Sequence, residues 1–191
     1  MGKILCFISQ DFADFEITLT FHKLKNVGHK EVLSVSYDLN PVISESGLYY
    51  QPNATIREAM ELEDVEGLII PGGPIREQRE ELTALIQKLD QEQKLLAAIC
   101  NGPQYLGRAG ILHTRPFTTS CAVERIQKLG VEDPFPRHQC LEEQRVVQDG
   151  HVITAKGRAF VDFSFAVFDY LGIYEGAQHE RDQLWNDIMD R

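Results

Sequence analysis

One cysteine, Cys100, has the neighbours that a nucleophile requires. It follows an apolar run at 95–99 that predicts a buried β-strand, and the helix predicted at 101–109 begins directly after it. Small residues surround it in the segment AAICNG, as at a nucleophile elbow, where a sharp strand-to-helix turn exposes the reactive atom. The helix N-terminus should then stabilise the thiolate and lower its pKa. A lone cysteine ending a strand is often only structural, but these small neighbours favour the nucleophile.

Other candidate residues follow the ends of two further predicted strands. Glu16 comes after the first strand, at 4–8, and Gly73 lies in the PGGP segment after the strand at 67–70. Ligands of open α/β sheets bind outside the carboxyl ends of the strands, so these residues should converge on Cys100. The Asn101 and Gly73 amides are then suited to form an oxyanion hole. Glu16 has two interpretations, because an acidic residue in a first helical turn often only complements the helix dipole.

The order of elements that must position these residues alternates between strand and helix. Such alternation predicts an α/β fold, a mostly parallel sheet with helices on both faces. We expect one domain over 1–191, with a core at about 3–172 and a C-terminal helix within 173–191. The remaining predicted strands are 32–35, 145–148 and 152–155, with a small hairpin at 42–50, and the predicted helices are 14–27, 56–60, 77–93, 122–129, 160–171 and 178–190.

Composition excludes several classes of function. The formal net charge of −10 argues against a nucleic-acid partner, which needs clustered Lys and Arg. No run approaches the roughly 18 apolar residues of a membrane helix, and the N-terminal segment does not resemble a signal peptide, so we expect a cytoplasmic protein. The four cysteines form no CxxC and no two histidines form an HxxxH pair, so neither a disulfide framework, a metal site nor another cofactor is expected. A dinucleotide site is disfavoured because no GxGxxG opens the first helix.

Four segments carry a resemblance to a known family. They are DFEITLTFHKLKNVG, LIIPGGP, LLAAICNGPQYLGRAGIL and VVQDGHVITAKGRAFVDFSFAVFDYLG. The chain resembles the ThiJ/PfpI family, which implies a flavodoxin-like three-layer sandwich related to class I glutamine amidotransferase domains. By this resemblance Cys100 is the reactive cysteine, Glu16 is its protonated partner, and Gly73 and Asn101 supply oxyanion-hole amides. The resemblance also implies a homodimer.

Two positions depart from the family pattern. Members use a histidine either directly after the cysteine or in a Thr-Thr-His-Pro turn, and here those positions hold Asn101 and Ser120. Ser120 is therefore a possible accessory residue, and His138, in a Pro-flanked loop, is a possible replacement for the histidine. Cys121, next to Ser120, could either resolve an oxidised Cys100 as a disulfide or simply be a small buried side chain. The missing histidine argues against a protease and against a class I amidotransferase.

Two functions remain. In the first, the protein is a cysteine-dependent hydrolase, peptidase-, glyoxalase- or deglycase-like, in which Cys100 attacks a carbonyl of a small-molecule or peptide substrate and Glu16 handles the proton. In the second, it is a non-catalytic, redox-responsive or chaperone-like stress protein, in which Cys100 is oxidised to sulfenic and then sulfinic acid.

Overall fold

A seven-stranded sheet forms the centre of the molecule in the computed structural model, which describes residues 1–189. The strand order is β5-β2-β1-β6-β7-β9-β8, and every strand is parallel to its neighbours except β8, which pairs antiparallel with β9. The bounds are β1 Lys3–Phe7, β2 Glu31–Ser36, β5 Ala54–Thr55, β6 Val65–Ile70, β7 Leu95–Ile99, β8 Val146–Asp149 and β9 Val152–Ala155. Strands β3 (Val42–Ile43) and β4 (Tyr49–Tyr50) form a separate hairpin.

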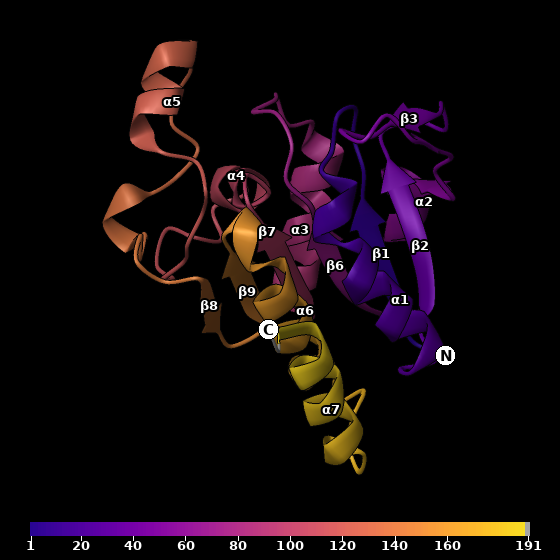
Figure 1. The fold of residues 1–191 in the computed structure, drawn as a ribbon. Coiled ribbons are helices and arrows are strands. Elements are labelled where there is room, and N and C mark those ends of the chain that lie inside the picture. The colour runs from indigo at the N-terminus through magenta and orange to yellow at the C-terminus, as the bar shows by residue number, and fades with distance from the viewer. Residues whose placement is uncertain (190–191) are drawn as a thin grey trace.

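Helices cover both faces of this sheet, so the predicted α/β sandwich is confirmed (Figure 1). One face carries α1 (Thr18–Asn26), α6 (Phe160–Leu171) and α7 (Gln178–Met189), and the other carries α2 (Ile56–Met60), α3 (Glu80–Gln91), α4 (Pro103–Arg108) and α5 (Val123–Leu129). Short 3-10 turns lie at Asp14–Glu16, Arg137–Gln139 and Gly157–Ala159. The helix predicted to end at Asp190 is followed to Met189, and Asp190 lies outside the described residues. The expectation of one domain stays a prediction.

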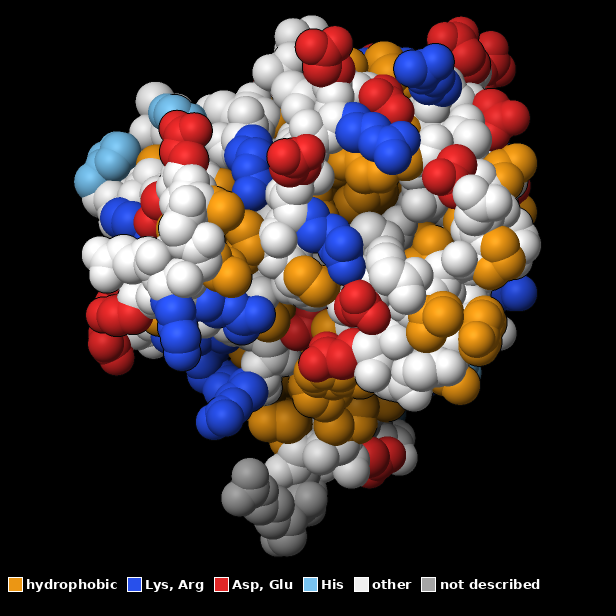
Figure 2. Space-filling view, turned by 90° about the horizontal axis from the view of Figure 1, so that it is seen from above, with side chains coloured by type: hydrophobic (Ala, Val, Ile, Leu, Met, Phe, Trp, Pro, Cys, Tyr) orange, Lys and Arg blue, Asp and Glu red, His pale blue; other side chains and the backbone are white. Residues whose placement is uncertain are grey.

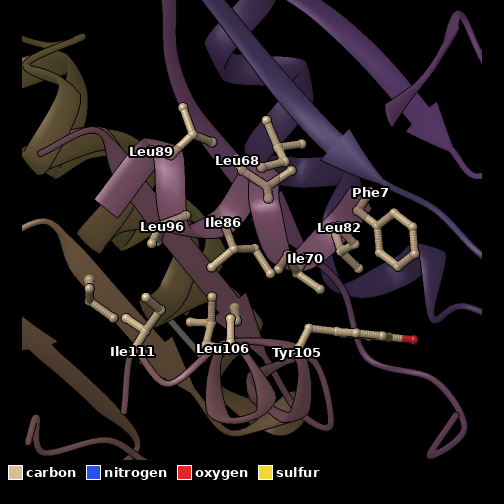
Figure 3. Close-up of a cluster of buried hydrophobic side chains, with 14 of the residues drawn as sticks. Phe7, Leu68, Ile70, Leu82, Ile86, Leu89, Leu96, Tyr105, Leu106 and Ile111 are labelled. Carbon is tan, nitrogen blue, oxygen red and sulfur yellow. The ribbon is translucent and has the colours of Figure 1, made fainter. Parts of the chain in front are cut away.

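Alternation along the strands creates two hydrophobic cores, one on each face. Leu5 and Phe7 of β1 point into the core beneath α2, α3 and α4, whereas Ile4 and Cys6 point into the core beneath α1 and α6. Figure 3 shows the first core, where Leu82, Ile86 and Leu89 from one stripe of α3 pack on strands β6 and β7. Burial on both faces explains why the central strands are continuous apolar runs.

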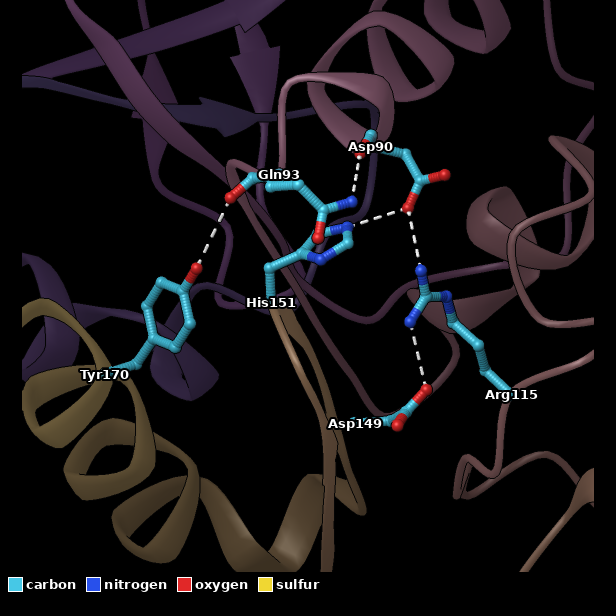
Figure 4. A network of polar contacts seen from close by, with 6 residues as sticks. All are labelled: Asp90, Gln93, Arg115, Asp149, His151 and Tyr170. Carbon is cyan, nitrogen blue, oxygen red and sulfur yellow. Dashed lines mark hydrogen bonds and ion pairs between the residues drawn. The ribbon is translucent and has the colours of Figure 1, made fainter.

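A polar network closes the edge of the sheet opposite Cys100. Buried His151, at the amino end of β9, bonds through its Nε2 to Asp90 Oδ1 at 2.7 Å. Arg115 joins this carboxylate to Asp149 with N–O distances of 3.4 and 3.0 Å (Figure 4). The His151 side chain therefore joins α3 to the β8–β9 hairpin. It lies far from the carboxyl ends of the strands.

Two of the boundaries that differ from the sequence prediction lie next to the residues singled out in the sequence. The helix expected at 14–27 is split, because Ile17 leaves the helical region (φ −123°) and separates the 3-10 turn at 14–16 from α1. The helix after Cys100 begins at Pro103 rather than Asn101, because residues 100–102 form the turn itself. Among residues 1–189, the longest and most apolar helices fall short of what spanning a bilayer demands.

Candidate active site

Cys100 occupies a strained turn at the carboxyl end of β7. Its φ of 62° lies in the left-handed region, which costs a residue with a side chain roughly 1–3 kcal/mol. Three hydrogen bonds hold this conformation: Cys100 N–H donates to Ala155 O at 2.8 Å, and Cys100 O accepts from Thr119 Oγ1 at 2.6 Å and from Ser120 N–H at 3.1 Å. The turn therefore has the geometry of the predicted nucleophile elbow.

Gly102 lets this turn lie against the neighbouring strand. A Cβ at this position would stand 2.5 Å from Ile70 O and 2.9 Å from Pro71 O, so only glycine fits. The small residue that the sequence places after the nucleophile is thus required by the carboxyl end of β6.

Glu16 reaches Cys100 from the 3-10 turn that follows β1. Glu16 is 2% exposed, its Oε2 accepts from Gly72 N–H at 2.7 Å, and its carboxyl lies beside the Cys100 sulfur. The 3-10 turn is fixed on the other side by the Asp14 carboxylate, which accepts hydrogen bonds from Ser44, Ser46 and Tyr50 of the β3–β4 hairpin. These hydroxyls hold the pKa of Asp14 below its usual value although burial opposes them.

Two glycines enclose the contact between Glu16 and the sulfur. A Cβ on Gly157 would lie 2.7 Å from Glu16 Oε1 and 3.0 Å from Cys100 Sγ, and a Cβ on Gly72 would lie 2.6 Å from Glu16 Oε2 and 3.1 Å from Sγ. The backbone of both strand ends is therefore in van der Waals contact with the reacting pair. Gly157 N–H also donates to Ser120 Oγ at 2.8 Å, which directs the Ser120 hydroxyl proton toward the sulfur.

The open side of Cys100 faces a cavity of about 400 Å³. This volume falls in the range of small-molecule sites. Its lining combines acidic, basic and backbone groups: Asp11, Ala13, Phe15, Glu16, Glu45, Gly73, Pro74, Cys100, Asn101, Ser120, Arg125, Gly157 and Arg158.

Comparison with known proteins identifies the group to which this site belongs. The DJ-1/PfpI family model matches residues 2–169. The chain belongs to the DJ-1/PfpI family. Deglycase PfpI of Pyrococcus furiosus is 28% identical over 81% of this chain and 89% of its own, and isonitrile hydratase of Pseudomonas putida is 27% identical over 88% of this chain and 72% of its own. The crystal structure of a DJ-1 superfamily protein from Agrobacterium tumefaciens, 27% identical, covers 98% of each chain with a TM-score of 0.81.

The structure of this DJ-1/PfpI member brings the residues singled out in the sequence together, with one exception. Cys100, Glu16, Gly73, Asn101 and Ser120 all line the same cavity. His138 is exposed on the 3-10 turn at 137–139, which packs beside Phe117 and α5, and it is not among the lining residues. The idea that His138 folds over the pocket is therefore wrong, and no histidine replaces the missing one among the lining residues.

Asn101 contributes through both its backbone and its side chain. Its N–H bonds to the Cys100 sulfur, and its Nδ2 donates to Gly73 O at 2.7 Å. That second bond fixes the Gly73 carbonyl, and the N–H of Gly73, in the preceding peptide, has no protein acceptor among residues 1–189. Gly73 and Asn101 both line the cavity that contains the sulfur, and their role as an oxyanion hole stays a prediction.

The ionisation of the pair differs from the expectation of an acidified thiol. Burial and the neighbouring Glu16 carboxylate raise the pKa of Cys100 to about 12, more than the Ser120 and Asn101 bonds lower it. Burial likewise raises the pKa of Glu16 to about 7, against the Gly72 N–H bond and helped by the nearby Glu45 charge. Near neutral pH the sulfur is therefore a thiol beside a carboxyl group that is close to half ionised.

Several site residues were not recognised in the sequence. Gly72, rather than its neighbour Gly73, bonds Glu16, and Thr119 and Gly157 position the elbow and the sulfur. The sequence signal that could have identified them was their position. Gly72 follows strand β6, Gly157 follows strand β9, and Thr119 directly precedes Ser120. Cys121 is 2% exposed in the core beneath α5, which agrees with its interpretation as a small buried side chain. It lines a neighbouring cavity instead of the one that contains Cys100.

Burial of Glu16 predicts a pH-dependent cost in stability. Because the folded-state pKa exceeds the ordinary value of 4.5, the stability present below pH 4.5 is lost as pH rises through about 7, by at most ~3 kcal/mol. Glu16→Gln, which carries no charge, should raise the free energy of unfolding at pH 8 and leave it little changed at pH 4.5. Urea unfolding at both pH values measures this, with exposed Glu143→Gln as the matched control. Equal effects of Glu16→Gln at both pH values would contradict the buried ionisation.

The backbone strain at Cys100 predicts an inverted glycine effect. Cys100→Gly should be more stable than Cys100→Ala by about 1 kcal/mol, because glycine adopts a positive φ without strain. At Ala98, two residues earlier in β7, Ala98→Gly should instead destabilise the protein, since that residue lies in a buried strand. Thermal unfolding of the three variants measures these differences in stability. If Cys100→Gly were less stable than Cys100→Ala, the turn would be unstrained.

Proposed function

We propose that this protein is a cysteine-dependent hydrolase that cleaves small carbonyl–amine adducts, as a deglycase does. The observation that carries the proposal is the buried Glu16 carboxyl beside the Cys100 sulfur, since a Cβ on Gly72 or on Gly157 would collide with both groups. This contact supports Glu16 as the proton acceptor of the nucleophile in a family member that has no histidine in this cavity. A base whose pKa lies near 7 is well matched to proton transfer at neutral pH.

The first half of the reaction uses this pair directly. As the Cys100 sulfur bonds to the carbon that carries the nitrogen, the thiol proton passes to the Glu16 carboxylate, so the poor acidity of the thiol is overcome in the same step. Glu16 delivers this proton to the nitrogen as the carbon–nitrogen bond breaks, and the amine leaves. Glu16 then takes the proton from the sulfur-bound carbon while the π electrons of the neighbouring carbonyl move to its oxygen, and the Gly73 and Asn101 N–H groups stabilise the resulting enediolate. Return of this proton to the neighbouring carbon, with transfer of the hydroxyl proton between the two oxygens, leaves a thioester on Cys100.

Water completes the cycle. It adds to the sulfur-bound carbon while Glu16 again accepts a proton, and collapse of the tetrahedral species breaks the carbon–sulfur bond. The proton on Glu16 returns to sulfur, so the enzyme is regenerated and the net reaction is hydrolysis. Gly72 N–H steadies Glu16 throughout, because its 2.7 Å bond to Oε2 is independent of the sulfur.

The relatives support this class of chemistry. A named deglycase and a named isonitrile hydratase each match most of the chain, and both names describe chemistry at a small electrophilic carbon. The cavity of about 400 Å³ suits a small molecule better than an extended peptide. The redox alternative is less well supported, because oxidation follows thiolate character and the pKa of the buried Cys100 is raised.

Turnover of a defined adduct tests the proposal. Methylglyoxal adducts of N-acetyllysine should release the free amine, and Cys100→Ser should abolish the release. Glu16→Gln should lower the rate by about 10²–10⁴-fold, the usual contribution of a general base. The wild-type rate should rise with pH through about 7, as the Glu16 carboxyl becomes able to accept the thiol proton.

Cys140→Ser is the matched control, since Cys140 lies outside the Cys100 cavity, and it should retain full activity. Cyclohexyl isocyanide and an unstructured peptide serve as rival substrates. Turnover of either one alone would contradict the proposed substrate class. Full activity in Cys100→Ser would remove the cysteine mechanism, and selective addition of two oxygens to Cys100 without any turnover would favour the redox alternative.

We also propose a homodimer, as the family resemblance implies. Phe15, Leu48 and Tyr49 are large hydrophobic side chains that are 50%, 57% and 76% exposed. All three lie on the unit formed by the 3-10 turn at 14–16 and the β3–β4 hairpin, which Asp14 joins. Light scattering should give the mass of two chains, and Leu48→Asp with Tyr49→Asp should give one chain, whereas the exposed control Leu129→Asp should remain dimeric. A wild-type mass of one chain would refute the dimer.

A further inference from the structure

The cavity that contains Cys100 has a cationic side. Arg125, from α5, and Arg158, from the 3-10 turn at 157–159, both line it and are both exposed. Neither guanidinium forms an ion pair with a carboxylate within residues 1–189. Two arginines without carboxylate partners beside a nucleophile are notable in a chain whose formal net charge is −10.

The cationic side continues into a second cavity of about 440 Å³. Ser120 and Arg158 line both cavities, and Arg137, Arg145 and Lys156 line the second. Figure 2, which looks down on the carboxyl ends of the strands, shows blue side chains gathered toward the left of this face, on the side where β8 and β9 lie in Figure 1. The positive charge is therefore concentrated on one side of the site.

Arg158 is the cation best placed to act on a substrate bound to Cys100. It directly follows Gly157, whose α-carbon packs against the sulfur, and the Gly157 N–H is anchored on Ser120. Its own carbonyl accepts from Arg145 at 3.4 Å. The Arg158 side chain therefore extends from the residue directly after Gly157, which packs against the sulfur. Hydrogen bonds hold this turn at both ends.

Among the cationic side chains that line the two cavities, Arg125, Lys156 and Arg158 are left to bind a substrate. Arg137 and Arg145 already bind Asp133 and Asp162 at 2.8 Å.

Acidic groups also line the two cavities, and one of them, Glu124, directly precedes Arg125 in α5. Asp11 is paired with Arg76 at 3.1 Å, whereas Glu45, Glu124 and Glu142 line the cavities as carboxylates that oppose an anion. Hydrolysis of a neutral adduct at Cys100 and Glu16 requires none of these cations.

We propose that Arg158 and Arg125 bind a carboxylate or phosphate group of the substrate, whose nitrogen-bearing carbon reacts at Cys100 and whose remainder extends toward Lys156. Guanidinium groups suit this task because their planar N–H donors match both anions in two-point contacts. The inference rests on the proposed function in one respect, namely that the molecule bound by these arginines is the substrate of Cys100. The anion site itself is tested without turnover.

Alkylation of Cys100 by two reagents of similar size tests the site. Iodoacetate and iodoacetamide each form a carbon–sulfur bond with release of iodide, while the thiol proton goes to the buffer. The ratio of the iodoacetate rate to the iodoacetamide rate should be about tenfold higher at Cys100 than in glutathione, because the cations attract the anionic reagent. Peptide mass spectrometry separates Cys100 from Cys140, which lines the second cavity.

Variants identify the groups responsible. Arg158→Gln should lower the rate ratio several-fold, the double variant with Arg125→Gln should bring it to the glutathione value, and Arg158→Lys should keep most of it. Lys128→Gln is the matched control, because it removes a charge from the same helix as Arg125 but lies outside both cavities, and it should change nothing. A wild-type ratio equal to that of glutathione, or one that Arg158→Gln and Arg125→Gln leave unchanged, overturns the proposal.

Protection experiments separate the two anions. Inorganic phosphate and succinate are each added during reaction with neutral iodoacetamide, and saturable protection by one of them names the group that the site prefers. Protection by neither overturns the anion site. A raised rate ratio in a protein that turns over no adduct would refute only the proposed function, and turnover without a raised ratio would refute only the anion site.

Discussion

The burial of a carboxyl group beside a thiol governs this site. Removing Glu16 and Cys100 from water makes both groups hold their protons more tightly, and the negative charge of Glu16 further opposes ionisation of Cys100. The pair therefore shares its protons as a unit, with one carboxyl titrating near pH 7 and a thiol that stays protonated. Every other feature of the site either keeps these two groups in contact or limits what else touches them.

The sheet supplies that contact through the order of its strands. Strands β1, β6, β7 and β9 are neighbours, so Glu16, Gly72, Cys100 and Gly157 all emerge at one edge. The glycines let two of these strand ends lie directly against the sulfur and the carboxyl group, where a methyl group would collide. Strain at Cys100 is sustained because the carbonyl and N–H of that residue are both fixed by other segments.

The fold and the principal residues could be predicted from the sequence because both depend on local pattern. Continuous apolar runs such as 95–99 mark doubly buried strands, and the order of strands and helices determines which ends share an edge. The role of Gly72 could not be predicted, because either glycine of the PGGP segment satisfies the same pattern and only the tertiary position of Glu16 selects between them. The surroundings of the Cys100 thiol could not be predicted in full, since a helix N-terminus is visible in a sequence but the burial of Glu16 beside the sulfur, which acts to raise the pKa of Cys100, is not.

The absence of histidine from the Cys100 cavity changes how reactivity is controlled. An imidazole next to a cysteine can form an ion pair with it, which keeps the sulfur ionised at rest. A carboxylate cannot, because its own charge disfavours the thiolate, so in the proposed mechanism the sulfur becomes nucleophilic only while its proton is moving to Glu16. Such a site reacts slowly with random electrophiles and faster with a substrate held against the sulfur. Cations beside the nucleophile supply a means of holding one, and this links the buried acid on one side of Cys100 to the exposed arginines on the other.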